Sequence, residues 1–368
     1  MHQTIFPRLS SRRLTGIFLT FTAGALISSA TAQTSSYQQT NLVSNTLHAA
    51  AHTQRSLVNP WGLAISPALG FEIVNNGLGT FAGYDAVGDE LALVARVAGP
   101  PSLEANPGPS AIVYNPTGTF ILGGLGAIPS PFLFATTDGT ISGQYADRNG
   151  DILESTILAV DNSKEGAVYT GLAILTPNCC APFLAVANFK DRFIETYTDF
   201  FAPLGIPGAF IDSKLPAGYA PFNLQVVGGQ LFVTYAPQNS AKNGPVVGTG
   251  NGIVDIYELD GTFVRRFVSQ GQLNAPWGVA KAGANFGPFS NDILIANFGN
   301  GTINAFNPVT GAFVGTIKNA AGTAIVNPGL RGIAFGSSGV GDPNTLYFTS
   351  GVTGQSSFFG AISAITTK

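Results

Sequence analysis

Charged side chains are scarce in this 368-residue chain. Lys, Arg, Asp and Glu together make up 10% of it, against about 25% in typical globular proteins. The formal net charge is −3, and no long run of Lys or Arg occurs. Such a chain lacks the basic surface that nucleic acids and anionic membranes select. We therefore expect neither a nucleic acid nor a membrane surface as a partner.

Cysteine occurs only as the adjacent pair Cys179 and Cys180. This arrangement excludes the spaced Cys and His ligands of structural zinc sites. A disulfide between neighbours would close a small strained ring and could not join distant parts of the chain. Two interpretations stay open, a vicinal disulfide and a pair of free thiols in a turn before a strand.

Histidine is also scarce, and the common catalytic motifs are lacking. Beyond the N-terminal segment only His48 and His52 occur. Their spacing would suit a zinc-binding helix, but no Glu lies between them in the usual position and no third ligand is evident. The chain has no G-x-S-x-G turn and no P-loop, since the glycine-rich stretch 248–252 has no Lys. We therefore predict no catalytic residue.

Apolar runs long enough to span a membrane are missing after the N-terminal segment. That segment has Arg8, Arg12 and Arg13, then an apolar stretch over 14–27, then small residues up to Ala32. This order is typical of a cleaved secretory signal. We predict a signal peptide over 1–32 and an exported mature chain over 33–368, periplasmic or extracellular. An uncleaved anchor is the alternative, and both Sec and twin-arginine export stay open.

Turn-forming and aromatic residues are abundant, with 46 Gly, 23 Pro and 27 Phe. Together with β-branched residues they favour many short strands joined by turns. An internal repeat supports this interpretation. Residues 59–64 read Asn-Pro-Trp-Gly-Leu-Ala, and residues 275–280 read Ala-Pro-Trp-Gly-Val-Ala. Related openings recur every 48 to 61 residues, with anchors at positions 62, 110, 171, 223, 278 and 332.

Each repeat continues with a second apolar run, a turn rich in Gly or Asn, and a third run, as in 71–81 and 293–303. A period near 50 with four strands per unit indicates the blades of a β-propeller. We predict an all-β, six-bladed propeller with four-stranded antiparallel blades. The last unit is short, and residues 37–43 have no unit of their own. We expect this N-terminal strand to complete the last blade and close the ring.

The motifs also resemble a poorly characterised family of exported bacterial NHL-like β-propeller proteins, some of whose members carry PEP-CTERM-type sorting tails. The resemblance spans the mature chain. It implies the propeller fold and brings no established activity with it. The chain departs from the family pattern at Asn75, Thr137 and Gln144, where the family tends to have an acid, a Glu and an aromatic residue. The residues that carry the resemblance lie at 59–64, 135–143, 215–223, 233–236, 273–278, 297–306 and 346–350.

The candidate ligand-binding residues are polar positions that recur after the second strand of a unit. Asn75, Asn188 and Asn297 share this position, and Asn223 and Asp138 are further candidates. Because equivalent positions converge in a propeller, a ring of amide oxygens could bind Ca²⁺ or a polar ligand. The alternative is that each side chain stabilises its own turn by bonding the backbone.

Trp61 and Trp277 occupy equivalent places in two units. They could pack between blades, or they could form a stacking surface for a sugar or another flat ligand. Since nucleophile–base pairs are lacking, we predict a non-catalytic, monomeric module that binds a protein, a glycan or a small molecule. The alternatives are a Ca²⁺-dependent, lactonase-like hydrolase or lyase with its site in the propeller channel, and a structural role in a surface layer.

Overall fold

The computed structural model describes residues 1–2, 35–91, 94–102, 106–146, 152–337 and 339–366. The predicted signal peptide therefore lies, except for its first two residues, outside the described part. Apart from the short 3₁₀ helix η1 (Gly287–Phe289), the regular structure of the described residues is all β, as the sequence predicts. None of the helices within these residues has the length and hydropathy that a membrane crossing requires.

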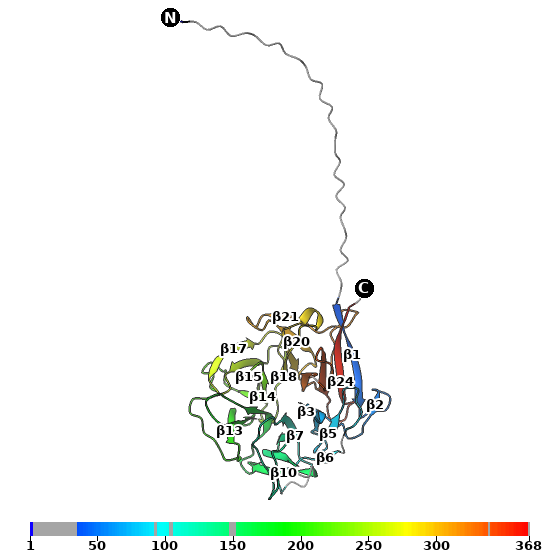
Figure 1. Cartoon of the computed structure of the whole chain (residues 1–368), viewed down its shortest axis with the longest axis vertical. Helices are drawn as coiled ribbons and strands as arrows, with labels where there is room; N and C mark the ends of the chain where they lie inside the picture. The colour runs from blue at the N-terminus through cyan, green and yellow to red at the C-terminus, as the bar shows by residue number, and fades with distance from the viewer. Residues whose placement is uncertain (3–34, 92–93, 103–105, 147–151, 338, 367–368) are drawn as a thin grey trace. The chain divides into compact units, whose positions relative to one another are not determined.

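The strands form five hydrogen-bonded sheets. In Figure 1 the sheets of the unit Thr34–Lys368 surround a common centre, with β3, β7, β14 and β18 towards the middle and β10, β13 and β17 towards the rim. Three of the sheets follow the chain in order. They consist of β11 (Tyr169–Leu175), β12 (Phe183–Asn188) and β13 (Phe193–Thr198); of β14 (Tyr219–Val227), β15 (Gln230–Pro237), β16 (Ile253–Tyr257) and β17 (Phe263–Ser269); and of β18 (Pro276–Lys281), β19 (Ile293–Asn297), β20 (Ile303–Phe306) and β21 (Phe313–Thr316).

The largest sheet has eight strands and spans two predicted units. Its halves are joined only where β6 runs parallel to β10, through the single residue pair Arg96 and Ser155. The order of its strands is β3 (Pro60–Ser66), β4 (Gly70–Asn75), β5 (Thr80–Tyr84), β6 (Ala95–Arg96), β10 (Ile152–Asp161), β9 (Thr140–Ala146), β8 (Phe132–Thr136) and β7 (Pro109–Tyr114).

The remaining sheet combines both ends of the described chain. It contains β22 (Ile333–Phe335), β23 (Thr345–Ser350), β24 (Phe358–Thr366), β1 (Ser35–Ser44) and β2 (His52–Thr53). β1 pairs antiparallel with β24 from Ser35 opposite Thr366 to Ser44 opposite Phe358. The prediction that residues 37–43 complete the last unit is therefore confirmed. Tyr37 anchors this strand, because its buried ring packs on Phe286 and its hydroxyl donates to the Phe286 carbonyl at 3.0 Å.

The sheets do not all have the four strands that the sequence predicts. The sheet of β11–β13 has three, and the segment after β13 contains Pro203 and Pro207. This segment forms only an isolated antiparallel bridge with β13, between Tyr197 and Pro203. Proline has no backbone N–H to donate to a strand ladder, which limits the bridge's extension into an outer strand. The observed strand groups therefore range from three to eight strands, against the uniform blades of the prediction.

Glycine at the repeated anchor positions lets the first strands of neighbouring units lie close together. A Cβ atom added to Gly278 would lie 2.3 Å from the carbonyl oxygen of Arg331, and one added to Gly171 would lie 2.6 Å from the Cα of Asn223. Both distances are shorter than van der Waals contact. The anchor motif thus reflects close approach of backbones.

Candidate functional site

A cavity of about 410 Å³ lies among the first strands of all six repeats, and we call it the channel cavity. Its walls are mostly aliphatic side chains from β3, β7, β11, β14 and β22. Among its described lining residues, Tyr114 is the only one with a titratable side chain. A hydrolase or lyase needs a group that can transfer a proton or stabilise charge. The channel cavity, where the sequence predicts the site of the enzymatic alternative, has no Asp, Glu, His or Cys among its described lining residues, and its polar side chains include Asn223 and Gln225.

The predicted tryptophans pack inside the fold. Trp277 is 4% exposed, and its Nε1 donates to the carbonyl of Thr170 at 3.1 Å. Asn223, another predicted site residue, donates from Nδ2 to the Trp277 carbonyl at 3.0 Å. Trp61 lies under the guanidinium of Arg331, whose Cζ is 3.9 Å from the ring centroid. Trp277 therefore packs between first strands, whereas Trp61 is half-buried and its ring faces Arg331.

Arg331 is a buried cation at the start of the last inner strand. Its Nη1 donates to Asn59 Oδ1 and to the carbonyls of Gly329 and Gly351, at 3.1, 3.1 and 3.2 Å. Burial lowers the pKa of Arg331, but a guanidinium keeps its proton in proteins. No carboxylate pairs with it among the described residues, where only His52 and Arg266 form ion pairs.

The three equivalent asparagines make hydrogen bonds to different partners. Asn75 donates to Thr80 Oγ1 at 3.4 Å, and Asn297 donates to the carbonyl of Gln272 at 3.0 Å and accepts from the Asn274 N–H at 2.9 Å. Asn188 contacts acids near its own turn, as described below. Of these three amides only Asn75 keeps a buried oxygen without a partner.

This donor set does not fit Ca²⁺. The ion takes six to eight oxygen ligands, several of them usually carboxylates. The three amides supply one unpaired buried oxygen, and no group of three or more acidic, His or Cys side chains within the described ranges could hold a metal. Asp138 does not join them, because its Oδ2 accepts the N–H of Gly108 at 2.6 Å and ties the turn after β8 to the segment before β7.

The two histidines do not share a helical face. His48 lies in a turn with a φ of 62°, and His52 belongs to the short strand β2. Nδ1 of His52 lies 3.5 Å from an oxygen of Asp89. The helical spacing considered from the sequence is therefore not realised.

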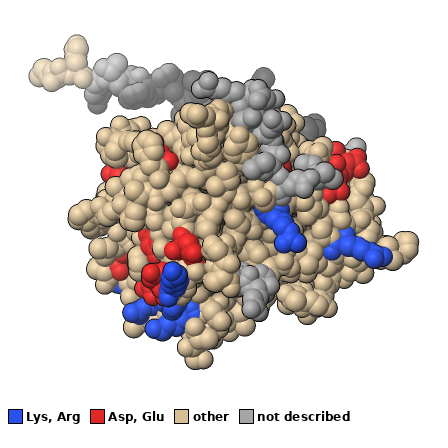
Figure 2. All heavy atoms as spheres, turned by 90° about the horizontal axis from the view of Figure 1, so that it is seen from below, with Lys and Arg blue, Asp and Glu red and all other residues tan. Residues whose placement is uncertain are grey.

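Charged side chains gather in small groups separated by wide uncharged surface, as one face of the molecule shows (Figure 2). One acidic group lines a cavity of about 600 Å³ beside β13, which we call the acid cavity. Three carboxylates, two amides, one phenol and two phenylalanines contribute to its walls. They are Glu165, Asp191 and Glu195, Asn162 and Asn188, Tyr197, and Phe193 and Phe210.

Glu195 is held by donors from three strands. Its Oε2 accepts the hydroxyls of Tyr169 and Tyr197 at 2.6 and 2.5 Å, and its Oε1 accepts Nδ2 of Asn188 at 2.6 Å. Burial, and then the hydrogen bond to Glu195, raises the pKa of both tyrosines, so they remain protonated donors. Asn162 donates to both phenol oxygens, at 2.7 and 2.8 Å, and completes the network.

Asp191 lies next to Glu195. Nδ2 of Asn188 donates to Oδ2 of Asp191 at 3.0 Å as well as to Glu195, so one amide nitrogen joins the two carboxylates. Asn188 is the only predicted site residue that lines the acid cavity. Sequence analysis missed the acids because they come from a turn and a neighbouring strand and form no recognisable motif. The one available signal was that acids occur in the seven residues after Asn188, whereas none follows Asn75 or Asn297 at that distance.

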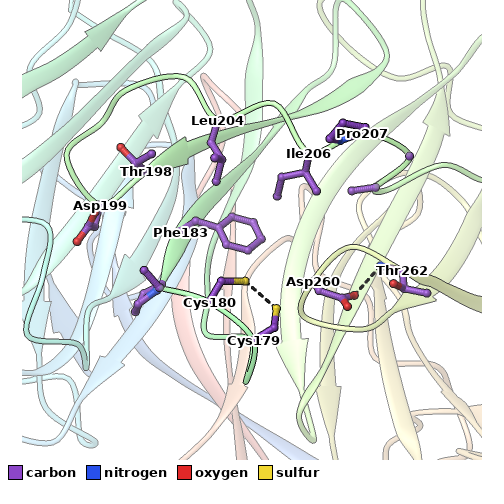
Figure 3. Close-up of a pocket in the computed structure, with 14 residues that line it drawn as sticks. Cys179, Cys180, Phe183, Thr198, Asp199, Leu204, Ile206, Pro207, Asp260 and Thr262 are labelled. Atoms are coloured by element: carbon purple, nitrogen blue, oxygen red, sulfur yellow. Dashed lines mark hydrogen bonds between the residues drawn. The ribbon is translucent and has the colours of Figure 1, made fainter.

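Cys179 and Cys180 line a third cavity, of about 540 Å³, which we call the cysteine cavity (Figure 3). Both are exposed free thiols in the turn between β11 and β12. Their Sγ atoms lie 2.7 Å apart. The vicinal disulfide that the sequence left open stays a prediction.

Solved structures with a similar arrangement of strands are propeller-type enzymes. The soluble aldose sugar dehydrogenase of Escherichia coli has a TM-score of 0.53 at 14% identity, over 89% of this chain and 99% of that one. The GH93 α-L-arabinofuranosidase of Fusarium graminearum has a TM-score of 0.51 at 12% identity, over 83% and 92%. These likenesses establish the propeller-like fold. They contradict the prediction of a non-catalytic binding module, because the solved structures with this arrangement of strands are enzymes.

No family model matches the chain. Two uncharacterised proteins of Acanthamoeba polyphaga mimivirus are similar to it in sequence. One is 33% identical over 326 residues, covering 84% of this chain and 76% of the viral protein. The other is 31% identical over 301 residues, covering 80% and 77%. The resemblance to exported bacterial proteins stays a prediction. At this identity and coverage, the chain belongs to the same family as these mimivirus proteins.

Proposed function

We propose that the protein is a hydrolase that cleaves glycosidic bonds in the acid cavity. The observation that carries this proposal is the pair of carboxylates, Asp191 and Glu195, joined by the amide of Asn188 at the cavity wall. Most glycoside hydrolases use such a pair, because one carboxyl group transfers a proton while the other stabilises positive charge on the sugar.

The roles of the two acids follow from their surroundings. Glu195 is fixed by two phenols and an amide, so its carboxyl oxygens have a defined position. It would stabilise the positive charge that develops at the anomeric carbon. Asp191 is exposed to solvent beside this fixed carboxyl group. It would protonate the leaving oxygen as the C–O bond breaks, and then accept a proton from the water that adds to the sugar carbon.

The remaining walls suit a carbohydrate. Asn162 and Asn188 are amides of the kind that bond sugar hydroxyls, and Phe193 is 51% exposed at the cavity. An exposed aromatic face packs against the apolar face of a sugar ring. Two of the structurally similar enzymes have sugar-related names, an aldose sugar dehydrogenase and an arabinofuranosidase seen in complex with arabinobiose. These names guide the choice of substrates to test.

We further propose that the fold has six blades, and that the enzyme is exported and monomeric. The blade count treats the eight-stranded sheet as two units, since a single residue pair joins its halves. Export is supported by the arginines, the apolar stretch and the small residues within 1–32.

Hydrolysis of a panel of nitrophenyl glycosides and arabino-oligosaccharides tests the proposed function. Replacing Glu195 with Gln, or Asp191 with Asn, is expected to lower kcat/KM by a factor of about 10² to 10⁴, the usual effect of losing one acid–base group. Glu258→Gln changes an exposed acid outside the acid cavity and serves as the control. If the wild-type protein cleaves no member of the panel, or both variants keep full activity, the assignment is wrong.

A further inference from the structure

The adjacent thiols of Cys179 and Cys180 are positioned to react with each other. Their Sγ atoms are in contact at 2.7 Å, in a turn whose side chains are open to solvent. Exposed cysteines react with disulfides at a rate that depends on thiolate formation and access. The hydrogen bond to Cys179 raises the pKa of Cys180 and so favours the protonated form of Cys180.

The wall opposite the sulfurs is apolar. Figure 3 shows Phe183, Leu204 and Ile206 facing the space beside the two cysteines. Phe183 comes from β12 and is 3% exposed, whereas Leu204 and Ile206 belong to the proline-containing segment after β13 and are half-buried. A volume of about 540 Å³ is within the range of cavities that bind small molecules.

The polar groups at this cavity are negative. Asp199 and Asp260 both line it, and no Lys or Arg is among its lining residues in the described part of the chain. The hydrogen bond from the backbone N–H of Thr262 lowers the pKa of Asp260, so this carboxylate is ionised at neutral pH. An anionic ligand is therefore repelled, while a neutral one can use the apolar wall.

We propose that Cys179 and Cys180 form a thiol–disulfide exchange site for a small, apolar, uncharged disulfide bound in the cysteine cavity. The Cys179 thiolate attacks one sulfur of the ligand, which forms a mixed disulfide and releases the first half of the ligand as a thiol. Cys180 then loses its proton and attacks Cys179, which releases the second half. The two cysteines lose two electrons and two protons, and the ligand disulfide gains them.

Two chromogenic disulfides distinguish this site from ordinary exposed thiols. Dithiodipyridine is neutral, and dithiobis(nitrobenzoate) carries a negative charge on each half. For each state of the protein, the rate with the neutral reagent is divided by the rate with the anionic reagent. At low ionic strength, this ratio is expected to be roughly tenfold higher for the folded protein than for the urea-unfolded chain. The neutral reagent should release two thiopyridone molecules per protein and leave no adduct, so that the protein mass falls by two hydrogens.

Single variants test each part of the proposal. Cys180→Ser should release one thiopyridone and retain a mixed disulfide on Cys179. Asp260→Asn should speed the anionic reagent and leave the neutral one unchanged, and Ile206→Ser should slow the neutral reagent alone. Equal rate ratios for folded and unfolded protein would overturn the proposal, as would stable adducts on both cysteines of the wild type. Glycoside hydrolysis by Cys180→Ser reports separately on the acid cavity.

Discussion

The buried carboxyl group of Glu72 makes the stability of this protein depend on pH. Glu72 lies in β4 and is 4% exposed, between the fully buried Phe71 and Ile73. Its Oε2 atom has no hydrogen-bond partner. Burial raises the pKa of Glu72 to about 8, from 4.5 for the free group. A carboxyl group in this setting stays protonated in the folded protein at neutral pH.

The size and sign of the effect follow from linkage. Between these two pKa values the folded chain holds a proton at Glu72 that the unfolded chain has lost. The folded state therefore binds more protons, and the free energy of unfolding falls as pH rises. Each pH unit costs about 1.4 kcal/mol, so the loss begins near the unfolded pKa and amounts to on the order of 5 kcal/mol once the pH passes the folded value.

Urea unfolding of the wild type and of Glu72→Gln measures this loss. Gln has nearly the same shape and cannot ionise, so the variant should lack the Glu72 contribution between about pH 5 and about pH 8.5. Glu258→Gln, at an exposed position, should keep the wild-type dependence. If wild type and Glu72→Gln lose the same free energy of unfolding over this range, the carboxyl is not buried in its neutral form.

Three further predictions concern packing and metal. Tyr37→Ala should lower the free energy of unfolding by about 3–5 kcal/mol, while the exposed Gln38→Ala should change it by less than about 0.5 kcal/mol; urea denaturation compares the two. Gly278→Ala should lower the melting temperature because its Cβ would clash with the Arg331 carbonyl, whereas Gly118→Ala, with open space around it, should not. EDTA should leave the melting temperature unchanged, since the amide set does not fit Ca²⁺; a drop on chelation would restore the calcium hypothesis.

The repeat could be predicted from the sequence because the same steric requirement recurs from unit to unit. First strands approach closely, and this proximity selects glycine at positions such as 171, 278 and 332. The closing strand was also predictable, since residues 37–43 had no unit of their own and the last unit was short. The three-stranded sheet was not predicted. It depends on two prolines after β13, whose effect on strand pairing is local and leaves the repeat spacing unchanged.

The candidate site was harder to predict for a geometric reason. Asn188 was singled out because it recurs, but its partners do not recur in the other repeats. Tyr169 comes from β11, Asp191 from a turn and Glu195 from β13, and only the folded sheet brings their polar atoms within hydrogen-bond distance. Repeated positions reveal what the units share. The acid cavity is built around the three-stranded sheet, and Asn162 and Glu165 reach it from the link between β10 and β11.

The pairing of β1 with β24 also determines when folding can finish. The partners Ser44 and Phe358 are separated by more than three hundred residues, so this ladder closes one of the longest loops that the chain can form. Contacts of such sequence separation form slowly because loop closure costs entropy first. During synthesis, β1 emerges first and must wait for β24. Until then both strands expose unpaired backbone groups, which makes the unfinished chain vulnerable to aggregation and dependent on rapid completion.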